Sequence, residues 1–238
     1  MKWQDTAFIL SRRAFGEKNH LIHVLSASHG RASGFVKYSN SRAHKSLLQI
    51  GNYVDVEWMA RLPEHLGHFI CKPIRAHASF IMQAGYLPLI ALSVSAEILE
   101  NILPENEPVP EIFADFKILV ENLNSDAWLA HYCRWEVNLL AHLGFGLDLQ
   151  QCAVTAGHDN LCYISPKSGR AVSDAGAKGY EDKLLPFPKL YRSDHPHPLK
   201  ISTDDAKESL AVSGYFLNKW VLNPFKKELP SNRVKLCQ

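Results

Sequence analysis

Cationic and aromatic side chains alternate in one stretch near the start of the chain, from Val36 to Ser46. The members suited to binding chemistry are Lys37, Tyr38, Arg42 and Lys45. Lysine and arginine neutralise phosphates, and a tyrosine ring offers a surface on which an unpaired base can stack. The stretch therefore predicts a site for a single-stranded nucleic acid. The alternative is that these basic residues only keep the surface charged and the protein in solution.

Four more cations precede this stretch and are expected on strands or turns beside it: Arg12, Arg13, Lys18 and Arg31. Residues 1–50 hold eight Lys or Arg and two acidic residues, a net charge of +6, whereas residues 51–130 have a net charge of −7. A basic segment followed by an acidic one suggests a polyanion-binding module joined to a body with another role. Phe35 is assigned to a hydrophobic core, which leaves Tyr38 as the stacking candidate.

Two groups of residues invite a metal interpretation. Cys152, His158 and Cys162 are spaced six and four residues apart, without the close cysteine pair and fourth ligand of a structural zinc site. We therefore predict no zinc and expect small buried thiols instead. The segment Asp194-His195-Pro196-His197 suits a metal-dependent hydrolase, which is the alternative function, but a proline-rich surface loop explains it adequately.

Motifs of catalysis are missing from the sequence. It has no glycine-rich phosphate loop ending in Gly-Lys-Ser or Gly-Lys-Thr, no H-E-x-x-H and no G-x-S-x-G. Ser165 to Arg170 has groups that can hold a phosphate, but its composition is typical of a hairpin turn. We predict a protein that is not an enzyme and needs no cofactor.

The elements that would position the basic residues are strands. Between Thr6 and Ala76, apolar residues alternate in five short segments separated by turn signals, with a long loop between the third and fourth. This pattern fits an OB-fold, a partly open five-stranded barrel, over residues 1–77, and an SH3-type barrel fits it nearly as well. The predicted fold class is α+β.

Helical periodicity replaces strand periodicity after residue 78. Apolar residues recur at helical spacing from Ile81 to Leu99, from Glu111 to Leu123 and from His131 to Leu143, and a last helix opens at Ser202. Gly144-Phe145-Gly146 supplies a glycine stop. We expect a helical domain over residues 78–238, interrupted by a small hairpin and an irregular loop region over residues 147–200.

Several of these motifs together resemble the RecO family of recombination mediator proteins. They are Trp3, Thr6–Leu10, Gly16-Glu17, His29-Gly30-Arg31, the basic stretch Lys37–Lys45, Arg134-Trp135-Glu136, Leu139-Leu140, Leu143–Gly146, Cys152 and the turn Ser165–Val172. The resemblance covers roughly residues 1 to 190. It implies an OB-fold followed by a helical domain. This chain lacks the paired cysteines that some relatives carry near residue 152.

The resemblance also implies a function in DNA repair and recombination. The barrel would bind and anneal single-stranded DNA, and the helical domain would bind RecR and the acidic C-terminal tail of single-stranded DNA-binding protein. Through these contacts it would help load RecA onto coated DNA. Arg134 is the candidate cation for the acidic tail, in a groove beside the apolar stripe of Tyr132, Trp135 and Leu139. The residues themselves favour a different role, an ion pair of Arg134 with Glu136 that locks the helix.

The composition indicates the cellular compartment of the protein. Apolar residues make up 46% of the chain and charged residues 21%, as in ordinary globular proteins. No apolar run is long enough to span a bilayer, and the first residues lack the apolar region of a signal peptide. Five scattered cysteines argue against a disulfide framework. These features predict a cytoplasmic protein with no membrane association.

Overall fold

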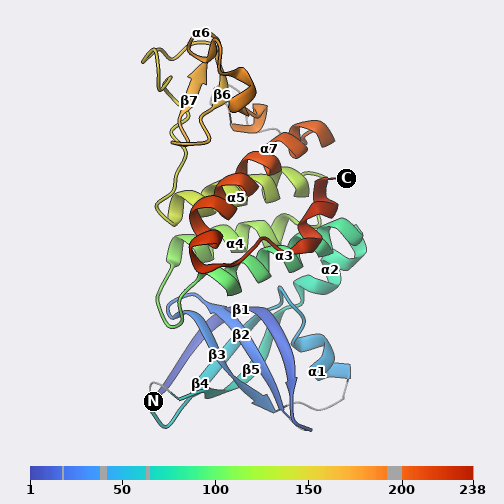
Figure 1. The fold of residues 1–238 in the computed structure, drawn as a ribbon. Coiled ribbons are helices and arrows are strands. Elements are labelled where there is room, and N and C mark those ends of the chain that lie inside the picture. Colours follow the sequence, from blue (N-terminus) through green and yellow to red (C-terminus); the bar gives the residue numbers. More distant parts are fainter. Residues whose placement is uncertain (18, 38–41, 63–64, 192–199, 238) are drawn as a thin grey trace. The chain divides into compact units, whose positions relative to one another are not determined.

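The computed structural model describes residues 1–17, 19–37, 42–62, 65–191 and 200–237. It divides into two compact units, residues 1–124 and 125–238 (Figure 1). The first unit contains a barrel and three helices that follow it, and the second contains further helices and a small sheet. The expected boundary between a DNA-binding domain, residues 1–77, and a helical domain, residues 78–238, stays a prediction.

The barrel is closed and has the strand order β1-β2-β3-β5-β4. Its strands are β1 (Lys2–Phe15), β2 (Asn19–Ser26), β3 (Gly30–Lys37), β4 (Tyr53–Met59) and β5 (Gly67–Arg75). All neighbours pair antiparallel except β3 and β5, which are parallel, and the β1–β4 pair closes the barrel. Five strands in this order form an OB-type barrel, which confirms the barrel that the family resemblance implies.

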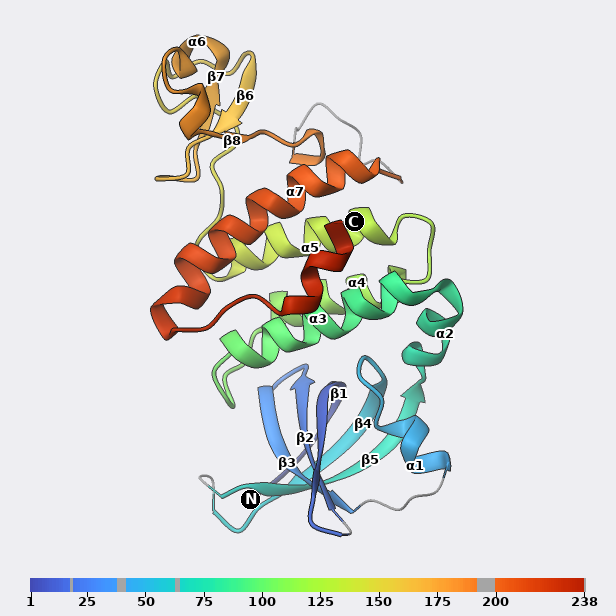
Figure 2. The same ribbon diagram turned by 45° about the vertical axis from the view of Figure 1, so that its right-hand side comes forward.

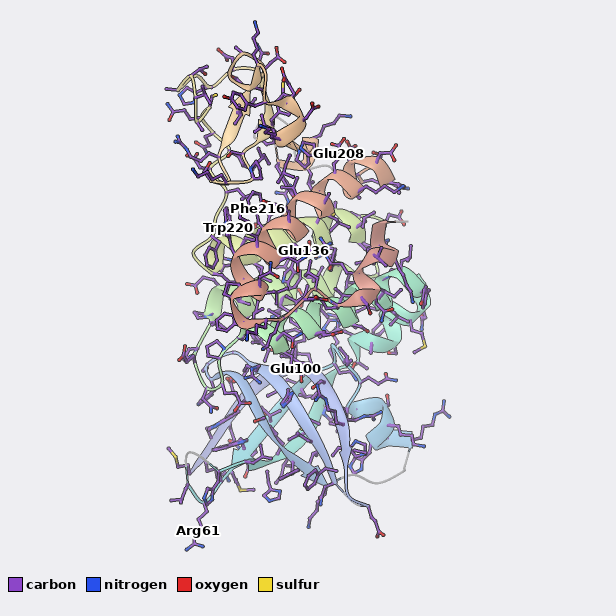
Figure 3. All side chains as sticks on the ribbon, in the orientation of Figure 1. Arg61, Glu100, Glu136, Glu208, Phe216 and Trp220 are labelled. Carbon is purple, nitrogen blue, oxygen red and sulfur yellow. The ribbon has the colours of Figure 1, made fainter. Side chains whose placement is uncertain are left out.

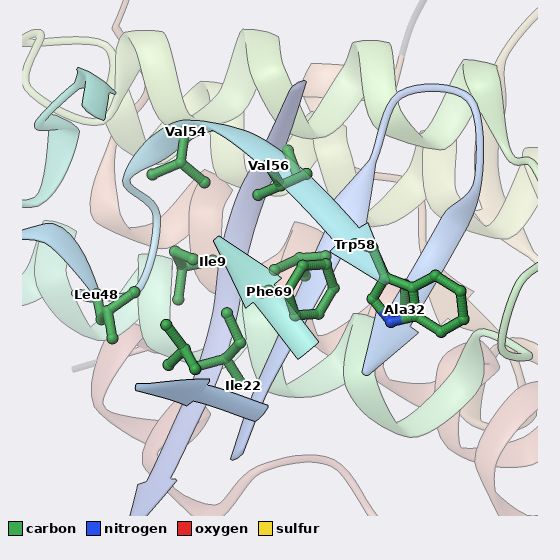
Figure 4. Packing of buried hydrophobic residues seen from close by; sticks show 11 residues of the cluster. Ile9, Ile22, Ala32, Leu48, Val54, Val56, Trp58 and Phe69 are labelled. Atoms are coloured by element: carbon green, nitrogen blue, oxygen red, sulfur yellow. The ribbon is translucent and has the colours of Figure 1, made fainter. Parts of the chain in front are cut away.

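The barrel interior takes every second residue of each strand. Val54, Val56 and Trp58 of β4 point inward, where they meet Ile9 of β1 and Phe69 of β5 (Figure 4). Burial of side chains of this size contributes about 1.5–3 kcal/mol each. Gly67 faces the Trp58 ring so closely that a Cβ atom would lie 2.3 Å from it, so the barrel wall needs a glycine here.

The connection from β3 to β4 is partly helical. Helix α1 (Arg42–Leu47) follows residues 38–41, which lie outside the described residues, and Leu48 after it is buried in the barrel core. The expected long loop therefore contains a short helix. Asn52 fixes the return to β4, because its buried amide donates to the carbonyl oxygens of Ser46 and Leu47.

Helices α2 (His77–Ala84), α3 (Tyr86–Ile102) and α4 (Pro110–Asn122) complete the first unit. The apolar spacing from Ile81 to Leu99 predicts a single helix, but the helix is interrupted at Gly85. Its φ of +128° is a backbone conformation that glycine adopts more readily than other residues. Phe8 on the outer side of β1 packs against Phe113 and Phe116 of α4. The helices thus cover one side of the barrel (Figure 2).

In the second unit, α5 (Trp128–His142) lies beside α7 (Thr203–Phe216). The predicted stop of α5 is confirmed: Gly144 has a φ of +84°, and the Phe145 N–H donates to the Leu140 carbonyl oxygen at 2.8 Å. Ser202 caps α7 by accepting from the Asp205 N–H. A π-helical segment, Leu217–Leu222, follows α7 and brings Trp220 against Phe216, with ring centroids 4.3 Å apart (Figure 3).

The hairpin expected in the irregular region is present. Strands β6 (Leu161–Ile164) and β7 (Ala171–Ser173) pair antiparallel, and β8 (Leu185–Pro186) adds a third strand in the order β7-β6-β8. Gly169 closes the turn with a φ of +68° and donates its N–H to the Ser165 carbonyl oxygen. The small core of this lobe consists of Cys152, Val172 and Ala177, the last of which ends the four-residue helix α6 (Asp174–Ala177).

Among the helices of the described residues, none combines the length and the apolar character needed to cross a membrane.

Candidate nucleic-acid interface

Three of the predicted cations lie together where β3 ends and α1 begins. Lys37 is the last residue of β3, and Arg42 and Lys45 are on α1, all three exposed. None of them forms an ion pair with another described residue. Among the described residues, no acidic side chain therefore neutralises these three charges. Arg12 is exposed as well and lines a hollow of about 250 Å³ with Leu48 and Leu92.

Arg13 and Arg31 already have acidic partners on the helical side of the first unit. The Arg13 Nη2 lies 3.0 Å from the Glu100 Oε1. Arg31 lies 3.1 Å from Glu105 and also donates its Nε to the Leu103 carbonyl oxygen. The Arg31 side chain is 16% exposed, whereas that of Arg13 is 70% exposed, so Arg13 is the more accessible to solvent.

Glu100 is the centre of this contact between barrel and helix (Figure 3). It accepts from the His23 Nδ1 at 2.6 Å in addition to Arg13. Burial of Glu100 raises the pKa of its carboxyl, but the hydrogen bond from His23 and the charges of His23 and Arg13 outweigh burial, so that this pKa lies below its usual value. The carboxylate is thus ionised and neutralises part of the basic surface.

Lys18 and Tyr38, the remaining predicted contacts, lie outside the described residues. The same holds for the cluster Asp194-His195-Pro196-His197.

The assignment of Phe35 to the barrel core is wrong. Val36 points into the barrel, so the preceding side chain, Phe35, points outward, where it is half-buried. Its ring lies 4.6 Å from that of Phe15 and 5.9 Å from that of His68, measured between centroids. Two phenylalanines and a histidine therefore meet on the outer surface of the barrel.

One of these rings, that of His68, also lines a pocket of about 550 Å³. Apolar side chains of β3, β5 and α1 form most of its wall, and Lys37, His44 and His68 line it as well. Burial, aided by the charge of Asp55, raises the pKa of the Cys71 thiol in this wall to about 12, so the thiol stays protonated. The pocket thus combines an apolar interior with a cation and two imidazoles, the mixture typical of small-molecule and base-binding sites.

In the second unit, the expected ion pair between Arg134 and Glu136 does not form. Glu136 is fully buried, and its carboxylate accepts from the Arg233 Nε at 2.7 Å and Nη2 at 2.6 Å. The Tyr132 and Ser213 hydroxyls also donate to it. Residue spacing could not have identified this partner, because Arg233 lies 97 residues away along the chain.

Arg134 itself is half-buried, and it makes no ion pair with another described residue. Burial lowers the pKa of its guanidinium. Tyr132, Trp135 and Leu139, the expected wall of a groove beside it, are buried instead. A groove at Arg134 must therefore use its neighbours on the same side of α5, such as His131 and Val137, which are half-buried.

The suspected zinc ligands are each engaged elsewhere. The Cys152 Sγ accepts hydrogen bonds from the Ser173 N–H and hydroxyl and from the Thr155 N–H. His158 donates its Nδ1 to the Gln150 carbonyl oxygen, and Cys162 donates to that of Asn160. Within the part of the chain that the structure describes, no three His, Cys, Asp or Glu side chains gather as they would around a metal ion.

These hydrogen bonds change the chemistry of Cys152. Its burial raises the pKa of the thiol, but the donors on Ser173 and Thr155 outweigh burial and lower that pKa to about 6. The lobe around β6 and β7 therefore holds a thiolate at neutral pH. The side chain is only 1% exposed, which separates it from solvent.

Comparison with known proteins covers both units. Residues 1–75 match the family described as "Recombination protein O N terminal", and residues 86–229 match "Recombination protein O C terminal". A "DNA repair protein RecO" of Wolbachia sp. subsp. Drosophila simulans is 37% identical, with 98% of each chain covered. A protein of the same name from Cereibacter sphaeroides is 36% identical, with 100% of this chain and 98% of the relative covered. Another, from Anaplasma marginale, is 37% identical, with 93% of this chain and 92% of the relative covered. The chain belongs to the RecO family of DNA repair proteins.

Proposed function

We propose that the protein is a non-enzymatic recombination mediator that binds and anneals single-stranded DNA through its barrel and recruits protein partners through its helical region. The observation that carries the DNA-binding part is the group of exposed cations Lys37, Arg42 and Lys45, which have no acidic partner among the described residues. The membership of the chain in a family of DNA repair proteins supports the same function.

Binding would rest on phosphate contacts from the basic side of the barrel. Each lysine or arginine that meets a phosphate releases condensed counterions, which favours binding at low salt. The cations around β3 and α1 would make the main contacts, Arg12 and Lys18 would add further phosphate contacts, and Tyr38 would stack on a base. Arg13 and Arg31 would contribute less, because Glu100 and Glu105 already balance their charges. Neutralising two strands on one surface would also lower their mutual repulsion and so assist annealing.

The helical region, residues 78–238, would supply the protein contacts. RecR and the acidic C-terminal tail of single-stranded DNA-binding protein are the proposed partners, and loading of RecA onto coated DNA is the proposed outcome, in the cytoplasm and without a cofactor. Arg134 is the proposed contact for the tail, because a half-buried guanidinium without an ion-pair partner among the described residues suits a carboxylate ligand.

A salt titration tests the DNA-binding function. The logarithm of the affinity for a single-stranded oligonucleotide should fall linearly with the logarithm of the salt concentration. Replacing Arg42 and Lys45 together by alanine should reduce the slope by about two, one for each cation that no longer meets a phosphate. The matched control replaces Lys178 and Lys207, exposed lysines of the second unit, by alanine. An equal slope in the wild type and the double variant would place the site elsewhere.

A further inference from the structure

Three aromatic rings from three strands form one row on the outer surface of the barrel. Phe15 ends β1, Phe35 lies in β3 and His68 lies in β5, where it is the direct register partner of Phe35. The Phe15 and Phe35 rings are tilted by 40° with centroids 4.6 Å apart, and the Phe35 and His68 rings by 46° at 5.9 Å. We call Phe15, Phe35 and His68 the aromatic row.

The aromatic row is not part of the barrel core. Its three residues are absent from the interior, which is filled by the alternate residues of the same strands, such as Val36 and Phe69. Phe15 is 55% exposed, and His68 is exposed too. Leaving aromatic surface in water forgoes the stabilisation of burying it, about 25 cal/mol for each Å². A ligand that covers these rings would recover that stabilisation.

The charge around the aromatic row is suited to a polyanion. Lys37 and Phe15 are both register partners of Asn19, so a cation flanks the row at its Phe15 end. His68 at the other end lines the pocket of about 550 Å³, together with Lys37 and His44. Residues 1–50 contain only two acidic residues. One of them, Asp5, is occupied by hydrogen bonds from the Ser26 hydroxyl and the Ser28 N–H.

We propose that the aromatic row is a stacking platform for unpaired bases, which makes the barrel select single-stranded over duplex DNA. The proposal rests on the proposed DNA-binding function and adds the residues that give it strand selectivity. Every unpaired base has an exposed π-face that can lie on a phenylalanine ring, whereas base pairing within a duplex keeps those faces stacked on one another. Phosphates of the same strand would meet Lys37, and a base at the His68 end would have the pocket beside it.

The test separates stacking from charge. Phe35→Leu keeps an apolar side chain without a π-face, and Phe15→Ala removes the exposed ring. Each should weaken binding of an oligothymidylate of about 15 nucleotides by about tenfold. Both variants should leave the affinity for duplex DNA of the same length unchanged. They should also leave unchanged the slope of log affinity against log salt concentration, because no charge is removed. Phe15→Trp should retain single-strand binding, because it keeps a π-face at this position.

Phe80→Ala on α2, where the ring is 49% exposed, is the matched control and should alter neither affinity. Circular dichroism confirms that each variant is folded. A 2-aminopurine base placed in the oligonucleotide gives a readout independent of affinity, because its fluorescence is quenched on stacking with the wild type and should recover with Phe35→Leu.

The outcomes distinguish the two proposals. If the wild type binds DNA with a steep salt slope but folded Phe35→Leu and Phe15→Ala keep the same ratio of single-strand to duplex affinity, the aromatic row is not the platform, although the DNA-binding function stands. If the wild type shows no salt-dependent binding, the proposed function itself fails. Loss of protein binding rather than DNA binding in these variants would identify the row as a docking site for a polypeptide and overturn the inference.

Discussion

Glu136 and Arg233 form a bidentate ion pair inside the second unit, with no part of the Glu136 side chain and 10% of the Arg233 side chain exposed. Further hydrogen bonds support the pair: Tyr132 and Ser213 donate to the carboxylate, and the guanidinium also donates to the Leu210 carbonyl oxygen. Gly214 makes room for the guanidinium, because a Cβ atom there would lie 2.7 Å from the Arg233 Nη1. The network ties α5, α7 and the segment Ser231–Cys237 into one interior.

Removing one member of this pair should be costly. Arg233→Met leaves the Glu136 carboxylate buried without its counterion, so we expect the free energy of unfolding to fall by about 3–5 kcal/mol, measured by urea denaturation. The double variant Glu136→Gln, Arg233→Met should be destabilised less, because no uncompensated charge remains. Arg170→Ala, which breaks an exposed pair with Asp148, should cost less than about 1 kcal/mol. Similar destabilisation by Arg233→Met and Arg170→Ala would show that the buried pair contributes little.

Arg134→Glu should weaken binding of an acidic peptide that ends in apolar residues, a synthetic equivalent of the tail of single-stranded DNA-binding protein, by about tenfold or more. The reason is that a half-buried cation without an ion-pair partner among the described residues becomes an anion. Fluorescence anisotropy of a labelled peptide against the full chain gives the affinity. Lys178→Glu is the matched control of equal charge change, and DNA binding should be the same in all three proteins. Equal peptide affinities would exclude Arg134 from the tail site.

Stability should depend on pH through Cys152. Its thiol has a pKa of about 6 in the folded protein, below the ordinary value of 9.0 expected after unfolding. A depressed pKa gives a stabilisation that is fully present above pH 9 and is lost as the pH falls towards 6. Urea denaturation between these values should therefore show stability rising with pH, and Cys152→Ser should flatten that rise. The ultraviolet absorbance of the thiolate monitors the same titration directly, and an unchanged pH profile in the variant would disprove the assignment.

Elemental analysis after dialysis should find no stoichiometric zinc. Cys152, His158 and Cys162 hydrogen-bond to separate partners, and the Cys152 sulfur already accepts from the N–H groups of Ser173 and Thr155. The same experiment discriminates against the metal-dependent hydrolase. One zinc ion per chain, together with loss of folding on chelation, would contradict the prediction.

The alternation of apolar and polar residues predicts the strands of a five-stranded barrel, because along β4 it leaves only one set of side chains that can face inward. It failed at Phe35 and Val36, two adjacent apolar residues of which only one can face inward, and the choice depends on the pairing with β2 and β5. The break at Gly85 was missed, because apolar spacing continues across it. Local spacing favours Arg134, the nearest arginine, as the partner of Glu136, because a tertiary contact such as that with Arg233 leaves no trace in local spacing.

The sequence separation of Glu136 and Arg233 also sets an order of events during synthesis. At about 5–20 residues per second, the 97 residues between them take a ribosome about 5–20 seconds to add. Throughout that interval the Glu136 carboxylate on α5 lacks the Arg233 guanidinium as its counterion, so burying this face of the helix is unfavourable. The nascent second unit should stay protease-sensitive until Arg233 emerges, whereas the barrel, whose last strand ends at Arg75, has all its pairing partners much earlier.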